Sequence, residues 1–145
     1  MKSEPLPLHR AAVRRNGDDV TLIAWHRMVH VALEAAETLA KEGIDVEVID
    51  IRSLRPLDLP RLIDSVAKTH CAVIVEEDCK FAGAGAEIAV ALTEAAFPDL
   101  VLPVKRLAAA DVPTPYNRQL ELASIPDVNA VINTIQTLVK EKDNR

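Results

Sequence analysis

Short continuous apolar runs alternate with segments of helical periodicity along most of this 145-residue chain, and that alternation is the strongest constraint on its fold. An unbroken apolar run of roughly four to eight residues is typical of a strand that is buried on both faces of a sheet. Apolar residues that recur every three or four positions indicate a helix with one buried face. The predicted strands are 11–15, 20–25, 46–51, 72–75 and 104–108, and the predicted helices are 29–42, 58–68, 85–97 and 128–139. This order predicts an α/β fold with a mostly parallel sheet that is covered on both faces.

Local signals place the ends of several elements. The turn sequence 16–19 follows the first predicted strand, which we expect to join the sheet as an antiparallel addition. Gly43 stands where a left-handed residue ends a helix. Asp58, with Pro60 in the first turn, is predicted to cap one helix, and Asp127 is predicted to cap the last one. Residues 111–117 are predicted to form a proline-rich irregular loop.

The chain is predicted to hold one domain, at 10–142, between an extended arm at 1–9 and a short tail at 143–145. Its net charge of −5 argues against a nucleic-acid partner, because domains that bind phosphate backbones usually carry a basic excess. Apolar runs fall well short of the ~20 residues that a membrane span requires. The first residues lack an apolar signal region, so secretion is not indicated.

The two cysteines lie on either side of one apolar strand. An extended backbone rises about 3.3 Å per residue, which separates Cys71 and Cys79 too far for a disulfide. We therefore expect free thiols in a reducing compartment, either the cytoplasm or, in a eukaryote, an organelle matrix.

Polar residues follow two of the predicted parallel strands, at the edge where ligands bind in such sheets. His26 and Arg27 follow one strand, and an acidic run that begins with Glu76 and Glu77 follows another. A crevice lined by His26, Arg27 and Glu76 has the groups for acid–base chemistry if the carboxylates are desolvated. The alternative, which we favour, is that Arg27 or Arg52 forms an ion pair with Glu76 or Glu77 at a solvated rim.

Two other patterns are weaker. Residues 82–87 contain two glycines between a strand and a helix, as in a dinucleotide-binding loop, but Ile88 occupies the third glycine position. Glycines that let a helix begin close to the sheet explain the same residues. His26 and His30 have the spacing of two metal ligands on a helix, but no third ligand stands at a matching position. We therefore assign no catalytic, cofactor-binding or metal-binding residue from these patterns.

Six blocks in one order resemble the last third of the β subunits of thiamine-diphosphate-dependent 2-oxo acid dehydrogenases, most of all those of pyruvate dehydrogenase. The blocks are DVTLIAWHRMVH (19–30), LAKEGIDVEVIDIRSLRPLD (39–58), VIVEE (73–77), FAGAGAEI (81–88), ADVPTPY (110–116) and SIPD (124–127). The segments 48–58 and 111–116 are the most distinctive.

The resemblance implies a transketolase C-terminal-like domain: a three-layer α/β/α sandwich with a mostly parallel five-stranded sheet and one antiparallel edge strand. In such enzymes thiamine diphosphate and magnesium lie between two other domains, which bind the pyrophosphate and pyrimidine groups. The resemblance therefore implies that this domain binds no cofactor, carries no catalytic residue and is inactive alone, although the parent protein is an oxidoreductase.

The role that the resemblance implies is assembly with the α subunit and a second β subunit, and docking of the dihydrolipoyl acyltransferase core. The acidic chain suits a basic docking domain, since opposite charges favour encounter. From loop position and chemical character, we expect partner contacts at Glu77, Phe81, Asp111 and Tyr116, beside the loop 113–115.

Other interpretations remain open. The parent substrate is expected to be pyruvate, with acetoin or branched-chain 2-oxo acids as alternatives. A chain of another class would be a free-standing domain that binds a small molecule or anion at His26 and Arg27. A fragment of transketolase or deoxyxylulose-phosphate synthase is a third possibility, but segment 111–116 fits the dehydrogenases better.

Overall fold

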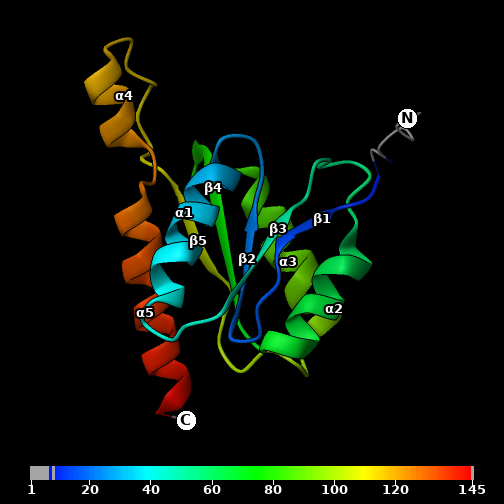
Figure 1. Cartoon of the computed structure of the whole chain (residues 1–145). Coiled ribbons are helices and arrows are strands. Elements are labelled where there is room, and N and C mark those ends of the chain that lie inside the picture. Colours follow the sequence, from blue (N-terminus) through cyan, green and yellow to red (C-terminus); the bar gives the residue numbers. More distant parts are fainter. Residues whose placement is uncertain (1–6, 8, 145) are drawn as a thin grey trace, which may run out of the picture.

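Five strands form one sheet between two layers of helices in the computed structural model, which describes residue 7 and residues 9–144 (Figure 1). The elements are β1 (Ala12–Arg15), β2 (Val20–Ala24), α1 (Met28–Ala40), β3 (Val46–Asp50), α2 (Leu59–Thr69), β4 (Ala72–Cys79), α3 (Ala84–Ala96), β5 (Lys105–Ala109), α4 (Arg118–Ser124) and α5 (Val128–Asp143). The predicted arm at 1–9 lies mostly outside the described residues, and the predicted tail begins inside α5.

The sheet has the strand order β1-β3-β2-β4-β5. Strands β2 to β5 pair in parallel, and β1 pairs antiparallel with β3 at one edge. Leu22 in the central strand β2 lies opposite Val48 on one side and Val73 on the other. This arrangement confirms the predicted α/β/α sandwich with one antiparallel edge strand.

Each face of the sheet has its own apolar core because successive side chains of a strand point to opposite faces. Leu22 packs in the core beneath α1 and α5, whereas its neighbour Ile23 packs in the core beneath α2 and α3. Figure 1 shows these two helix pairs on opposite sides of the sheet. The unbroken apolar runs in the sequence therefore correspond to strands that are buried on both faces.

The last quarter of the chain contains a helix that the sequence interpretation did not include. Helix α4 begins after Asn117, whose side-chain oxygen accepts hydrogen bonds from the backbone N–H groups of Gln119 and Leu120. It is seven residues long and buries none of its side chains. Strand β4 is also longer than predicted, since it continues to Cys79 past a register shift against β5.

The predicted helix-end signals have different outcomes. Asp127 caps α5, because its carboxylate accepts a hydrogen bond from the backbone N–H of Ala130 at 2.7 Å. Gly43 adopts a left-handed φ of 83° after α1, as predicted. Asp58 precedes α2 but makes no side-chain capping bond. Its carboxylate instead accepts a hydrogen bond from the backbone N–H of Ala11 at 2.9 Å, which fixes the start of β1 beside α2.

A buried polar network joins α2 to the sheet. The hydroxyl of Thr21 lies 2.6 Å from that of Ser65 and 2.7 Å from that of Thr69. Ser65 donates a hydrogen bond to the carboxylate of Glu47, which also accepts one from Lys68. This bond to Glu47 raises the pKa of Lys68, although partial burial acts in the opposite direction. The network satisfies polar groups that would otherwise destabilise the core.

We predict that Glu47→Gln lowers the free energy of unfolding by about 1–3 kcal/mol near neutral pH, because it weakens two hydrogen bonds to a buried carboxylate. The raised pKa of Lys68 implies stabilisation that is present below the ordinary lysine pKa of about 10.4 and is lost as the pH rises through the folded-state pKa. Urea unfolding across this range should therefore show the difference from wild type shrinking. The exposed Glu37→Gln is the control, and a difference independent of pH would contradict the role of Lys68.

Candidate functional site

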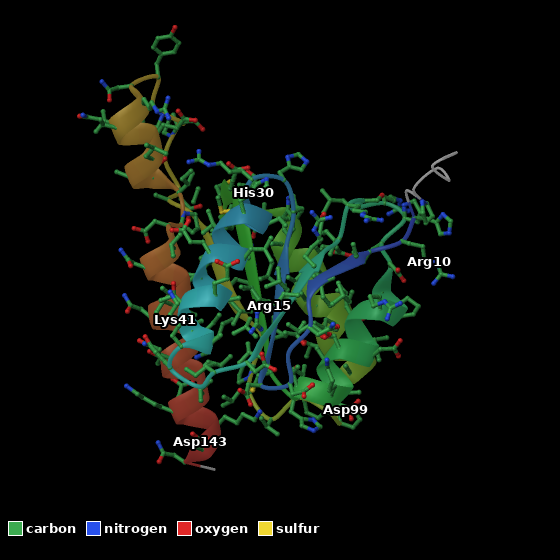
Figure 2. All side chains as sticks on the ribbon, in the orientation of Figure 1. Arg10, Arg15, His30, Lys41, Asp99 and Asp143 are labelled. Atoms are coloured by element: carbon green, nitrogen blue, oxygen red, sulfur yellow. The ribbon has the colours of Figure 1, made fainter. Side chains whose placement is uncertain are left out.

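The carboxyl ends of β2, β3, β4 and β5 lie at the same end of the molecule because these strands are parallel. His30 and Arg10 lie toward this end in Figure 2, whereas Asp99 and Asp143 lie toward the opposite end. The predicted crevice residues His26, Arg27 and Glu76 all belong to segments at this end. The structure nevertheless places the three side chains in different environments.

Glu76 is buried, with an exposed fraction of 0%. Its carboxylate forms an ion pair with the guanidinium of Arg106, at 2.6 Å, and accepts a hydrogen bond from the backbone N–H of Gly85, at 2.8 Å. We expected Arg27 or Arg52 to be the cation. Arg106 is the partner because β5 pairs directly with β4 and brings Arg106 opposite Ile74, two residues before Glu76.

The glycines at the start of α3 make room for this carboxylate. A Cβ atom at Gly85 would lie 2.3 Å from Oε1 of Glu76, and one at Gly83 would lie 2.3 Å from the carbonyl oxygen of Cys79. The N-terminus of α3 thus receives an internal carboxylate, which its partial positive charge favours. Close packing of helix and strand accounts for the glycine pattern, and the N–H of Gly85 is already occupied.

The remaining crevice residues lie apart from Glu76. His26 lines a small pocket with Arg52, whereas Arg27 is exposed at the N-cap position of α1. Glu77 lines a different hollow, which reaches from β4 to Ser124. Within residues 9–144, no group of three or more histidine, cysteine, aspartate or glutamate side chains is arranged to hold a metal ion.

Two of the predicted contact residues, Phe81 and Asp111, lie together. The backbone N–H of Phe81 donates a hydrogen bond to the Asp111 carboxylate at 3.1 Å, and both residues line one shallow hollow. The Phe81 side chain is 81% exposed, and Tyr116 is fully exposed. Nearby in the sequence, α4 adds two exposed leucines. We call the exposed apolar residues of these loops and of α4 the loop–α4 surface: Phe81, Val112, Tyr116, Leu120 and Leu122.

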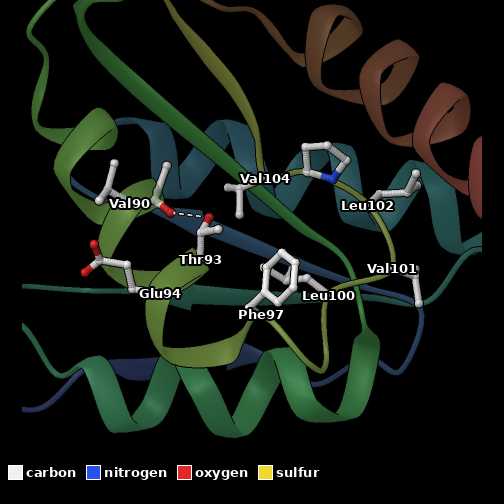
Figure 3. Close-up of a pocket in the computed structure, with 10 residues that line it drawn as sticks. Val90, Thr93, Glu94, Phe97, Leu100, Val101, Leu102 and Val104 are labelled. Carbon is white, nitrogen blue, oxygen red and sulfur yellow. Dashed lines mark hydrogen bonds between the residues drawn. The ribbon is translucent and has the colours of Figure 1, made fainter.

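A second apolar surface lies along α3 and was not predicted. Figure 3 shows this groove of about 560 Å³ between α3 and the segment that leads into β5. Phe97, which is 71% exposed, and Val101 belong to its lining. The polar residues of the lining are Thr93, whose hydroxyl donates to the carbonyl of Ala89, and Glu94. Such a lining suits contact with an apolar surface and offers no acid–base pair.

Both cysteines are free, as predicted. Burial raises the pKa of the Cys71 thiol. Desolvation and the neighbouring Asp78 carboxylate raise the pKa of the exposed Cys79 thiol. Because the thiolate is the reactive form, neither cysteine is an activated nucleophile. In the described part of the chain, no helix is both long enough and apolar enough to cross a membrane.

Comparison with known proteins gives consistent matches over most of the chain. The family described as "Transketolase, C-terminal domain" matches residues 9–131. The pyruvate dehydrogenase E1 component subunit beta-2, mitochondrial, of Oryza sativa subsp. japonica is 46% identical over 127 residues, which are 88% of this chain and 34% of that protein. The corresponding beta subunit of Porphyra purpurea is 42% identical over 134 residues, which are 92% of this chain and 40% of that protein. The chain thus spans roughly a third to two fifths of these relatives.

Solved structures show the same fold. The structure titled "Split gene transketolase, inactive beta4 tetramer" superposes with a TM-score of 0.77 at 30% identity, over 93% of this chain and 43% of that one. A 2-oxoglutarate:ferredoxin oxidoreductase from Magnetococcus marinus has a TM-score of 0.58 at 15% identity, over 90% of this chain and 19% of that one. The second match shows likeness of fold alone.

We predict that Arg106→Met lowers the free energy of unfolding by about 3–5 kcal/mol, because it leaves a buried carboxylate without its cation. Adding Glu76→Gln should recover part of that loss, which a double-mutant cycle measured by chemical unfolding will show. Lys105→Met is the matched control. It removes the exposed ion pair with Glu141 and should cost less than about 1 kcal/mol. Equal losses for the two single variants would contradict a structural role for the buried pair.

Proposed function

The chain belongs to the transketolase C-terminal domain family, and from this membership we propose that it is the assembly and docking domain of a 2-oxo acid dehydrogenase β subunit. The identity of 46% over 127 residues to a pyruvate dehydrogenase beta subunit supports this branch of the family. Because the chain covers only 34% of that relative, the activity of the whole enzyme is assigned to the parent protein rather than to these residues.

The parent reaction that we propose is oxidative decarboxylation of pyruvate, with transfer of the acyl group to a lipoyl group. Acetoin and branched-chain 2-oxo acids are the alternative substrates. The proposed cofactors of the parent are thiamine diphosphate and magnesium. Residues 9–144 contain no group of three or more histidine, cysteine, aspartate or glutamate side chains arranged to hold a metal ion. Because the chain covers only 34% of the rice relative, we propose that other domains of the parent hold the cofactor and that this domain alone is inactive.

The loop–α4 surface is the observation that carries the docking role. Its members are large apolar side chains, of which Leu120 is 59% exposed and Tyr116 is fully exposed. Helix α4 buries no side chain against the rest of the domain, and Figure 1 shows it beyond the end of the sheet. Exposed aromatic side chains are enriched among the residues that contribute most to protein–protein contacts.

The proposed partners are the α subunit, a second β subunit and the dihydrolipoyl acyltransferase core. The chain's net charge of −5 supports attraction to a basic docking domain. The similar chain of the split-gene transketolase is titled an inactive beta4 tetramer, which supports self-association of chains of this kind. The groove along α3, centred on Phe97, provides a separate apolar surface for one of the subunits.

We also propose a cellular compartment and the bounds of the folded domain. Relatives from rice and pea are named mitochondrial, whereas the one from Rickettsia bellii is not. We therefore propose the cytoplasm or an organelle matrix. We also propose that residues 10–142 form the folded domain, between an arm at 1–9 and a tail at 143–145.

We predict that Phe81→Ala and Tyr116→Ala each weaken binding of the acyltransferase docking fragment by about tenfold, which corresponds to about 1.4 kcal/mol for an aromatic contact residue. The measurement is calorimetric titration of the 145-residue chain with the fragment from the same organism. Phe97→Ala is the matched control, because this phenylalanine is comparably exposed but lies in the α3 groove. Unchanged affinity in both variants would exclude these residues from the docking surface.

Titration of the wild-type chain with the docking fragment, and separately with the α subunit, tests the function itself. The chain should bind one of these partners with micromolar or tighter affinity, and analytical ultracentrifugation should show self-association at similar concentrations. A chain that stays monomeric and binds none of the three proposed partners would contradict the assembly role.

A further inference from the structure

A polar pocket at the carboxyl ends of β2 and β3 is not used by the proposed function. It has a volume of about 290 Å³ and is lined by Trp25 and His26, which follow β2, and by residues 51–55, which follow β3. It shares no lining residue with the hollows beside the loop–α4 surface or with the α3 groove. This pocket is therefore a separate candidate site.

The pocket carries two arginines that form no ion pair with any acidic side chain among the described residues. Arg52 and Arg55 line it and are exposed, and neither takes part in any ion pair found in residues 9–144. The carboxylate of Asp50 accepts a hydrogen bond from the backbone N–H of Arg52, and that of Asp58 is held by the N–H of Ala11. The chain has 22 acidic and 17 basic residues, so a shortage of acids does not explain these unpaired arginines.

Two residues of the pocket have a left-handed backbone conformation, one after β2 and one after the neighbouring strand β3. His26 has a φ of 52° and Arg52 a φ of 57°, a left-handed conformation that residues with a Cβ atom rarely adopt. Ala24 and Asp50, each two residues earlier, are paired in register, so the two left-handed residues lie at the same level of the sheet. Unfavourable backbone conformations of this kind cluster at ligand sites, where they place the binding groups.

We propose that this pocket binds the phosphate group of a small molecule. Two guanidinium groups match the double negative charge of a phosphate, and each can donate a pair of parallel hydrogen bonds to its oxygens. The hydroxyl of Ser53 and the ring of His26 add polar groups to the same lining. A volume of about 290 Å³ holds a phosphate with a small organic group, but it does not hold a segment of folded protein.

The test is thermal unfolding of the 145-residue chain in increasing concentrations of inorganic phosphate, with sodium chloride at matched ionic strength as the reference. Binding to the native state should raise Tm with phosphate concentration in a saturable way. Arg52→Gln and Arg55→Gln should each weaken the apparent Kd at least tenfold. Arg61→Gln is the matched control, since it removes one exposed, unpaired arginine of α2 outside the pocket.

Two results would overturn the site. One is an equal rise of Tm in chloride and phosphate, and the other is a phosphate-dependent rise of Tm that Arg61→Gln reduces as much as the pocket variants do.

Glycerol 3-phosphate is a second probe. Its tighter binding than inorganic phosphate would support an organic phosphate as ligand, and equal binding would support the free anion. The Phe81→Ala variant should keep the phosphate effect. If the wild-type chain binds its protein partners but does not bind phosphate, only the phosphate site is overturned and the proposed docking function is not affected.

Discussion

The buried carboxylate of Glu76 holds together β4, the start of α3 and the edge strand β5, and the arrangement of these three elements depends on it. Its ion pair with Arg106 connects β4 to the edge strand β5, and its bond from the N–H of Gly85 fixes the start of α3. A fully buried charge is tolerated only when charge and hydrogen bonds are supplied together. The Nε atom of Arg106 is itself buried without a hydrogen-bond partner among the described residues, so this satisfaction is incomplete.

The buried ion pair between Glu76 and Arg106 affects which parts of this edge of the sheet can contact other molecules. The carboxyl end of β4, where parallel sheets often bind ligands, is occupied by the structural pair. The loops beyond it lead outward to Phe81 and Tyr116, which face solvent. On the other half of the sheet, Arg52 and Arg55 follow β3 and form no ion pair within the part of the chain that the structure describes. At this edge of the sheet, the end of β4 thus contains a buried structural ion pair, while the segment after β3 exposes two arginines.

The sequence predicted the features that depend on local pattern and missed those that depend on strand order. The apolar runs that became β2 and β3 were recognisable because each strand is buried on both faces. The partner of Glu76 was not recognisable, because it depends on β5 lying beside β4 rather than on the nearest arginine in the predicted crevice. Helix α4 was missed because it lacks a buried face, so its residues show no apolar periodicity, although Asn117 was a usable capping signal. The glycines 83 and 85 were interpreted correctly as aids to close packing, but the carboxylate that they accommodate became visible only in the structure.

Helix α4 has little tertiary support, since none of its side chains enters either core. Besides its cap, a backbone hydrogen bond from the N–H of Ala110 to the carbonyl oxygen of Ser124, at 2.9 Å, holds its last residue beside the end of β5. Its unfolding therefore removes almost no apolar burial, and segments with so little tertiary support open far below the global unfolding free energy. A partner that packs on Leu120 and Leu122 would supply the missing tertiary contacts. Because α4 contributes no residue to either core, its local unfolding would leave the two cores beneath the sheet intact.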